Sequence, residues 1–112
     1  MESAMDALDD FLKSVGALYD ETRVKILKFI DLYGPMCVCD LEASFKMSQS
    51  RLSRHLKILK DAGFLVSRRC GRWTFYDTRS PMDRFRFEAI EEIRVLPISL
   101  PRLKKVSKGC GA

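Results

Sequence analysis

The sequence lacks the features that would mark a membrane protein, a secreted protein or a thiol enzyme. No stretch approaches the roughly 18 consecutive apolar residues that cross a bilayer, and the acidic start Met1–Asp6 has no basic region like that of a signal peptide. Histidine occurs once, at His55, no histidine pairs with a cysteine in sequence, and there is no CxxC pair. We therefore expect a cytoplasmic protein with no membrane partner, no enzymatic activity and no catalytic cofactor.

Positive charge is concentrated in one part of the chain. The net charge is +5, from 20 Lys and Arg against 15 Asp and Glu, yet residues 1–10 carry four acids and no base. Residues 46–72 carry eight bases and one acid, Asp61. Such a block can be an ordinary solvated face, but its confinement to one contiguous segment favours a polyanion, namely nucleic acid, as the partner.

Apolar periodicity predicts a mainly α-helical domain with a small β-hairpin, an α+β fold. We expect helices over residues 4–18, from about Asp20 to the stop at 34–35, over 39–46, over 49–62 behind the N-cap Ser48, and over 81–96. Two β-rich runs, 64–69 and 72–78, flank the dipeptide Cys70-Gly71 and predict a hairpin.

Two short helices joined by a tight turn and followed by a hairpin form the pattern of a winged helix-turn-helix. The second helix of such a domain packs by one apolar face, here Leu52, Leu56 and Leu59, and turns a polar face to DNA. Its polar face and the hairpin tip supply the predicted DNA-binding residues: Ser48, Gln49, Ser50, Arg51, Ser53, Arg54, His55, Lys57, Lys60, Arg69 and Arg72. Gln49 and Arg54 suit adenine and guanine edges, and the longer cations suit phosphates. We expect His55 to contact the backbone or to pack, because a metal site needs further ligands.

The two terminal helices carry apolar stripes that are too wide for so small a monomer. The stripes are Met5, Leu8, Leu12 and Val15 in the first helix and Phe85, Ala89, Ile93 and Leu96 in the last. We therefore expect a homodimer with residues 5–18 and 82–96 at the interface. Residues 1–96 are interpreted as one DNA-binding and dimerisation domain, and 97–112 as a basic tail that is mobile or loosely docked.

Two strings, CVCDL at residues 37–41 and SRHLKILKDAGFL at 53–65, resemble the ArsR/SmtB family of metal-responsive repressors, especially its arsenic-responsive branch. The resemblance covers about residues 10–95 and implies a homodimeric repressor that leaves double-stranded operator DNA when arsenic(III) or antimony(III) binds its cysteines. That branch usually has a third cysteine directly after the first string, where this sequence has Glu42. Cys37 and Cys39 therefore carry over as ligands, whereas the third ligand does not. The family's alternative site on the last helix is also missing, since residues 81–96 contain no histidine.

The four cysteines are expected to be thiols in a reducing cytoplasm, so that ligand or redox roles outrank disulfides. Soft metalloids prefer thiolates, but side chains two residues apart on a regular helix diverge by about 200°. Cys37 and Cys39 can therefore converge on one atom only where their segment is extended or distorted. We favour Cys110 in the tail as the third sulfur, with Cys70 or a two-thiol site as alternatives.

Other functions stay open at this point. The chain can be a redox, zinc or cadmium sensor that uses the same two thiols, a thiol enzyme, which the sequence supports weakly, or a structural DNA binder that senses nothing. A specificity ratio below about a thousandfold over random DNA would indicate the last of these.

Overall fold

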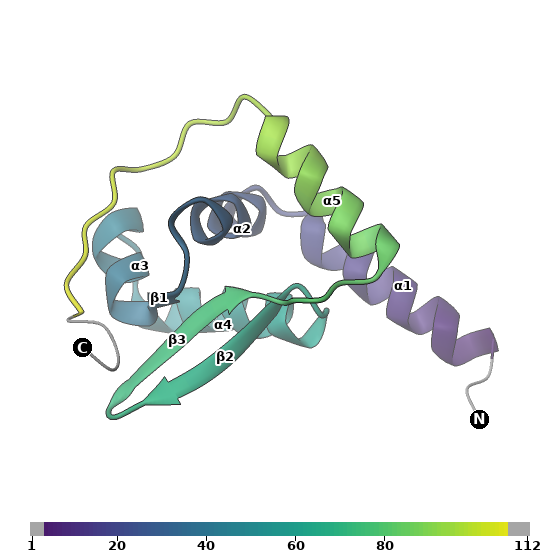
Figure 1. Cartoon of the computed structure of the whole chain (residues 1–112), viewed down its shortest axis with the longest axis horizontal. Coiled ribbons are helices and arrows are strands. Elements are labelled where there is room, and N and C mark those ends of the chain that lie inside the picture. Colours follow the sequence, from purple (N-terminus) through teal and green to yellow (C-terminus); the bar gives the residue numbers. More distant parts are fainter. Residues whose placement is uncertain (1–3, 108–112) are drawn as a thin grey trace.

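The computed structural model describes residues 4–107, over which the chain forms five helices and a three-stranded antiparallel sheet (Figure 1). The helices are α1 (Ala4–Leu18), α2 (Glu21–Tyr33), α3 (Val38–Phe45), α4 (Gln49–Asp61) and α5 (Arg84–Val95). The strands are β1 (Met36–Cys37), β2 (Leu65–Cys70) and β3 (Trp73–Thr78), in the order β1-β3-β2. Within the described range, no helix is both long and apolar enough to cross a membrane.

Capping side chains set the helix boundaries. Asp20 and Ser48 accept the N–H three residues further on, at the starts of α2 and α4, and Gly34 ends α2 with a φ of 86°. These are the boundaries that the sequence predicts. The prediction for the start of α5 is wrong by three residues: the helix begins at Arg84 rather than at position 81, because Asp83 is its N-cap.

The core lies between α2, α4 and the sheet. Ile26 and Phe29 of α2 are fully buried, as are the three leucines of α4 that were expected to face inward. Because these leucines hold α4 by one side, they determine which residues the helix presents to solvent.

Strand β1 is absent from the sequence prediction, since two residues are too few to show an alternating pattern. It pairs with β3, placing Cys37 opposite Phe75. The hairpin loop also differs from the prediction by one residue: Cys70 pairs with Trp73, which leaves Gly71 and Arg72 in the loop. Gly71 has a φ of 61°, a conformation that tight hairpin turns require and that glycine adopts without strain.

A buried arginine on α5 fixes the end of α4 against the terminal helices. Arg86 donates to the carbonyl of Ala62 at 2.8 Å and forms ion pairs with Asp83 at 2.7 Å and Asp10 of α1 at 3.2 Å. The neighbouring Gly63 has a φ of 86°, and a Cβ there would lie 2.8 Å from Nε of Arg86, so any other residue at this position would be strained.

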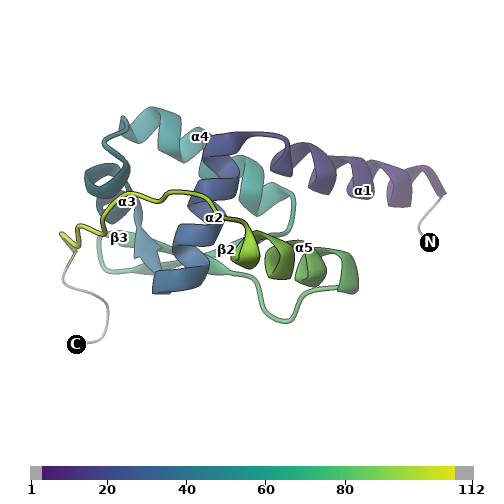
Figure 2. The same ribbon diagram turned by 90° about the horizontal axis from the view of Figure 1, so that it is seen from above.

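The segment 97–107, which we call the C-terminal strap, is docked more firmly than the sequence suggests. It runs from the end of α5 to α3, as both views show (Figures 1 and 2). Its residues Leu100 and Leu103 pack against the core, and Lys104 exchanges backbone hydrogen bonds with the hydroxyl of Ser44. An extended segment without a regular apolar period gives no sequence signal for such docking.

Candidate nucleic-acid interface and thiol site

The predicted DNA-binding side chains lie on the outer face of α4 and at the hairpin tip. The exposed ones are Ser48, Gln49, Ser50, Arg51, Ser53, Arg54, Lys57, Lys60, Arg69 and Arg72. Lys57 pairs with Asp61 at 3.0 Å and Lys60 donates to Ser67 of β2 at 2.7 Å. An exposed ion pair contributes little stability, and the contact of Lys60 is a single exposed hydrogen bond, so both cations remain available to a phosphate.

His55 is half-buried on the flank of α4, where it faces α2. Its Nδ1 lies 3.3 Å from a guanidinium nitrogen of Arg23. A neutral imidazole can accept a hydrogen bond from that nitrogen. Burial lowers the pKa of His55, and the positive charge of Arg23 adds to that effect while Asp20 opposes it. His55 therefore packs between α4 and α2.

Cys37 and Cys39 converge at the start of α3. Cys37 is the N-cap of this helix, with extended backbone (φ −85°, ψ 165°), while Cys39 lies in the first turn. Their Cα atoms are 5.3 Å apart and their sulfurs form a disulfide. The extended N-cap provides the distortion that convergence requires. The disulfide departs from the expectation of free thiols, because two sulfurs brought this close can bond.

Asp40, which the sequence did not single out, completes a three-residue cluster. One carboxylate oxygen and the two cysteine sulfurs lie within 4.8 Å of one another, the one such group of potential metal ligands in the described part of the chain. Asp40 and Cys37 also form a capping box, each side chain accepting the other's N–H at 3.4 Å. An aspartate three residues after an N-cap was the signal that could have identified it.

The carboxyl of Asp40 is ionised despite its burial. Burial would raise its pKa, but hydrogen bonds from Ser107, Val106 and Cys37 outweigh that effect and lower the pKa. Three of these bonds come from the strap.

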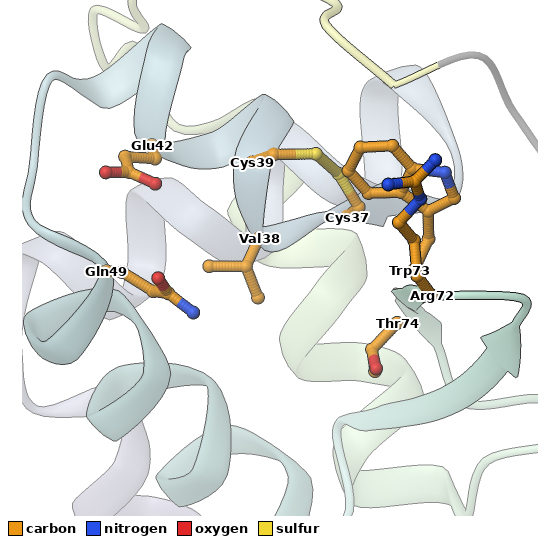
Figure 3. A pocket seen from close by; sticks show the side chains of 8 residues that line it. All are labelled: Cys37, Val38, Cys39, Glu42, Gln49, Arg72, Trp73 and Thr74. Atoms are coloured by element: carbon orange, nitrogen blue, oxygen red, sulfur yellow. A yellow bond between two sulfur atoms is a disulfide. The ribbon is translucent and has the colours of Figure 1, made fainter.

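A cleft of about 300 Å³ joins the thiol site to both predicted DNA-binding elements. It is lined by Cys37, Val38, Cys39, Glu42, Gln49, Arg72, Trp73 and Thr74. Trp73 and Arg72 lie beside the disulfide, while Glu42 lies across the cleft near Gln49 (Figure 3). Glu42 thus occupies the expected place of a third cysteine without joining the cluster of sulfurs.

The remaining two cysteines do not lie in this cleft as far as the chain is described. Cys70, which is also disulfide-bonded and so departs from the expectation of a thiol, is half-exposed at the end of β2, opposite Trp73. Cys110 lies outside the described residues. The identity of a third sulfur ligand therefore stays a prediction.

Exposed apolar side chains gather on the terminal helices. On α1, Leu8 and Leu12 are each 56% exposed, and on α5, Phe87 is 53% exposed. Phe11 and Phe85 join the two helices, with ring centroids 5.2 Å apart. The predicted stripe on α1 is thus largely free of intramolecular cover. On α5 the prediction is wrong for Ile93, which is buried in the core, and the exposed Phe87 lies outside the predicted stripe.

Comparison with known proteins agrees with this architecture. Residues 20–67 match the family described as bacterial regulatory protein, arsR family. The arsenical resistance operon repressor of Bacillus subtilis (strain 168) is 38% identical over 76 residues, covering 68% of this chain and 72% of that protein. The repressor of the same name from Escherichia coli (strain K12) is 42% identical over 59 residues, 53% of this chain and about half (50%) of its own length.

A solved structure shares the fold. The homodimeric winged helix-turn-helix DNA-binding domain Mb0332 from Mycobacterium bovis superposes with a TM-score of 0.69 at 23% identity, covering 85% of this chain and 86% of that one. The fold is therefore a winged helix-turn-helix, the architecture of DNA-binding transcriptional regulators rather than enzymes. Together with the similarity to the Bacillus protein, this shows that the chain belongs to the arsR family of bacterial regulatory proteins.

Proposed function

We propose that this chain is a cytoplasmic transcriptional repressor that leaves its operator when trivalent arsenic or antimony binds Cys37 and Cys39. The observation that carries the proposal is the convergence of these two sulfurs at the start of α3, beside the exposed face of α4. Soft metalloids bind thiolates, so the disulfide has to be reduced to two thiolates before the site can bind them, and a reducing cytoplasm supplies that reduction. Relatives at about 40% identity are named arsenical resistance repressors.

The DNA-bound form is proposed to be a homodimer. Its interface would cover the exposed apolar residues of α1 and α5, and Mb0332, which shares the fold, is described as homodimeric. Two copies of α4 would then enter successive major grooves, about 34–36 Å apart, while the hairpin tips reach phosphates or the minor groove.

Release is proposed to act through Cys37. This residue pairs with β3, which leads to the hairpin tip, and its sulfur caps α3, which packs on α4. A metalloid bound to that sulfur would compete with the hydrogen bond from the Asp40 N–H and bias the position of both DNA-binding elements. Coupling of this kind makes inducer and DNA lower each other's affinity.

Cys110 remains the preferred third ligand, ahead of Cys70 or a two-thiol site. The strap is anchored to Asp40 through Ser107, and a chain of three further residues reaches about 10 Å. That length suffices to return a sulfur to the thiol site of the same protomer.

A thiol-redox sensor is the second candidate function. The disulfide between Cys37 and Cys39 favours it, because the two sulfurs lie close enough at the start of α3 to bond to each other. Oxidant and metalloid would then act on the same two sulfurs.

Operator binding titrated in parallel with arsenite, antimony(III), zinc, cadmium and peroxide separates these candidates. We expect release by arsenite and antimony(III) at the lowest concentrations. Release by peroxide alone would favour the redox sensor, and a response to none of them would favour a structural DNA binder, particularly if specificity over random DNA is below about a thousandfold.

Substitutions on α4 should separate reading of bases from binding of phosphates. Arg54→Ala and Gln49→Ala are expected to relax sequence preference, costing about 1–3 kcal/mol on the operator and little on random DNA. Lys57→Ala should weaken both alike and lower the slope of log affinity against log salt by about one. Binding measured at several salt concentrations decides, and an unchanged operator preference in Arg54→Ala would show that the reading face lies elsewhere.

A further inference from the structure

We propose that the C-terminal strap determines which metals the thiol site accepts. While docked, the strap occupies the carboxylate of Asp40; once released, it frees that carboxylate to join Cys37 and Cys39 as an oxygen ligand for a thiophilic divalent cation such as zinc or cadmium. The inference rests on the proposed function to the extent that the two cysteines are the inducer site.

The carboxylate of Asp40 is saturated by hydrogen bonds. Oδ1 accepts the N–H groups of Val106 and Ser107 at 2.8 and 2.9 Å, and Oδ2 accepts the Ser107 hydroxyl at 2.8 Å and the Cys37 N–H at 3.4 Å. A carboxylate offers about four acceptor sites, so none is left for a metal. The side chain is also 0% exposed.

Release of the strap would free most of the acceptor sites on the Asp40 carboxylate. Three of the four donors belong to the strap, so only the Cys37 N–H would remain. A buried anion with one donor is costly, and a cation at the adjacent sulfurs would compensate it. In the disulfide form the oxygen lies within 4.8 Å of both sulfurs. Sulfur and oxygen ligands of one zinc ion are at most about 4.4 Å apart, so in the reduced protein small rotations of the two thiolates and the carboxylate would bring all three onto one ion.

The two classes of inducer differ in what they gain from Asp40. Zinc takes sulfur and carboxylate oxygen together, whereas a metalloid that prefers thiolates gains nothing from the carboxylate. A docked strap therefore keeps the site selective for sulfur-only inducers. Its separate attachments at Ser44, Leu100 and Leu103 hold it in place independently of the thiols.

The test compares the reduced full-length protein with a strap-release variant, Val106→Pro with Ser107→Pro, which removes all three strap donors to Asp40. Cadmium affinity is measured by chelator competition, with the thiolate-to-cadmium absorption as the signal. We expect the release variant to bind cadmium at least about tenfold more tightly, with no gain for arsenite. The control Lys105→Ala changes an exposed residue of the same strap and should bind cadmium like the wild type.

Adding Asp40→Asn to the release variant should remove the gain, because an amide is a poor ligand without charge. No gain on release, or a gain that survives Asp40→Asn, would overturn the inference. A second measurement uses the wild type alone. Saturating cadmium should speed tryptic cleavage after Lys104 and Lys105, whereas saturating arsenite should not. Equal cleavage rates with cadmium and with arsenite would count against the strap's role. Arsenite binding by the wild type tests the proposed function separately. Failure of the strap inference can therefore be told apart from failure of the proposed function.

Discussion

Cys37→Ser or Cys39→Ser is expected to leave operator binding intact and to abolish its release by arsenite. Either change leaves one thiolate of the converging pair, which is too few to hold a soft metalloid firmly. Operator binding should survive because neither side chain is on the exposed face of α4. The fold should survive as well, since serine is a preferred N-cap and can accept the Asp40 N–H in place of the Cys37 sulfur.

The measurement is operator occupancy against arsenite concentration for each variant, at concentrations that empty the wild-type operator. Cys70→Ser is the matched control and should change little, while Cys110→Ser should weaken the response if the tail supplies the third sulfur. X-ray absorption at the arsenic edge counts the bound sulfurs directly. A normal arsenite response in the Cys37→Ser, Cys39→Ser double variant would refute the sensor site while leaving the DNA-binding role in place.

The elements that carry a regular apolar period could be predicted from the sequence. Leu52, Leu56 and Leu59 recur at helical spacing and lie fully buried, so the outer face of α4 followed directly from them. The caps Asp20 and Ser48 placed two helix starts correctly, because N-capping depends on residues that are close in sequence.

Features that depend on contacts distant in sequence could not be predicted. Strand β1 exists because β3 pairs with it, and the strap is held by Asp40 and Ser44, more than 50 residues earlier in the chain. The role of Asp40 depends on β1 and on the strap, since its carboxylate links the N-cap Cys37 to the strap. The sequence singled out Cys37 and Cys39 as candidate ligands, but it did not show which groups surround them.

Leu12→Glu is expected to convert the protein to a monomer at micromolar concentration. Leu12 is 56% exposed on α1, so a single chain gains little from it, whereas a dimer would bury it in an apolar interface. A carboxylate buried there without a partner would strongly oppose association. Phe11 is less suitable for this test, because its ring already contacts Phe85 within one chain.

Loss of the dimer should lower operator affinity by about 10²–10⁴-fold, since two linked reading heads bind far more tightly than two independent ones. Sedimentation gives the mass, and operator binding at fixed salt gives the affinity. The control Tyr19→Glu adds the same charge at a side chain that is 92% exposed, just beyond α1, and should remain dimeric with nearly unchanged affinity. If Leu12→Glu stays dimeric, or if the wild type is itself a monomer, the exposed stripe on α1 is not the dimer interface. If instead both glutamate variants lose affinity equally, repulsion of DNA by the added charge, rather than loss of the dimer, is responsible.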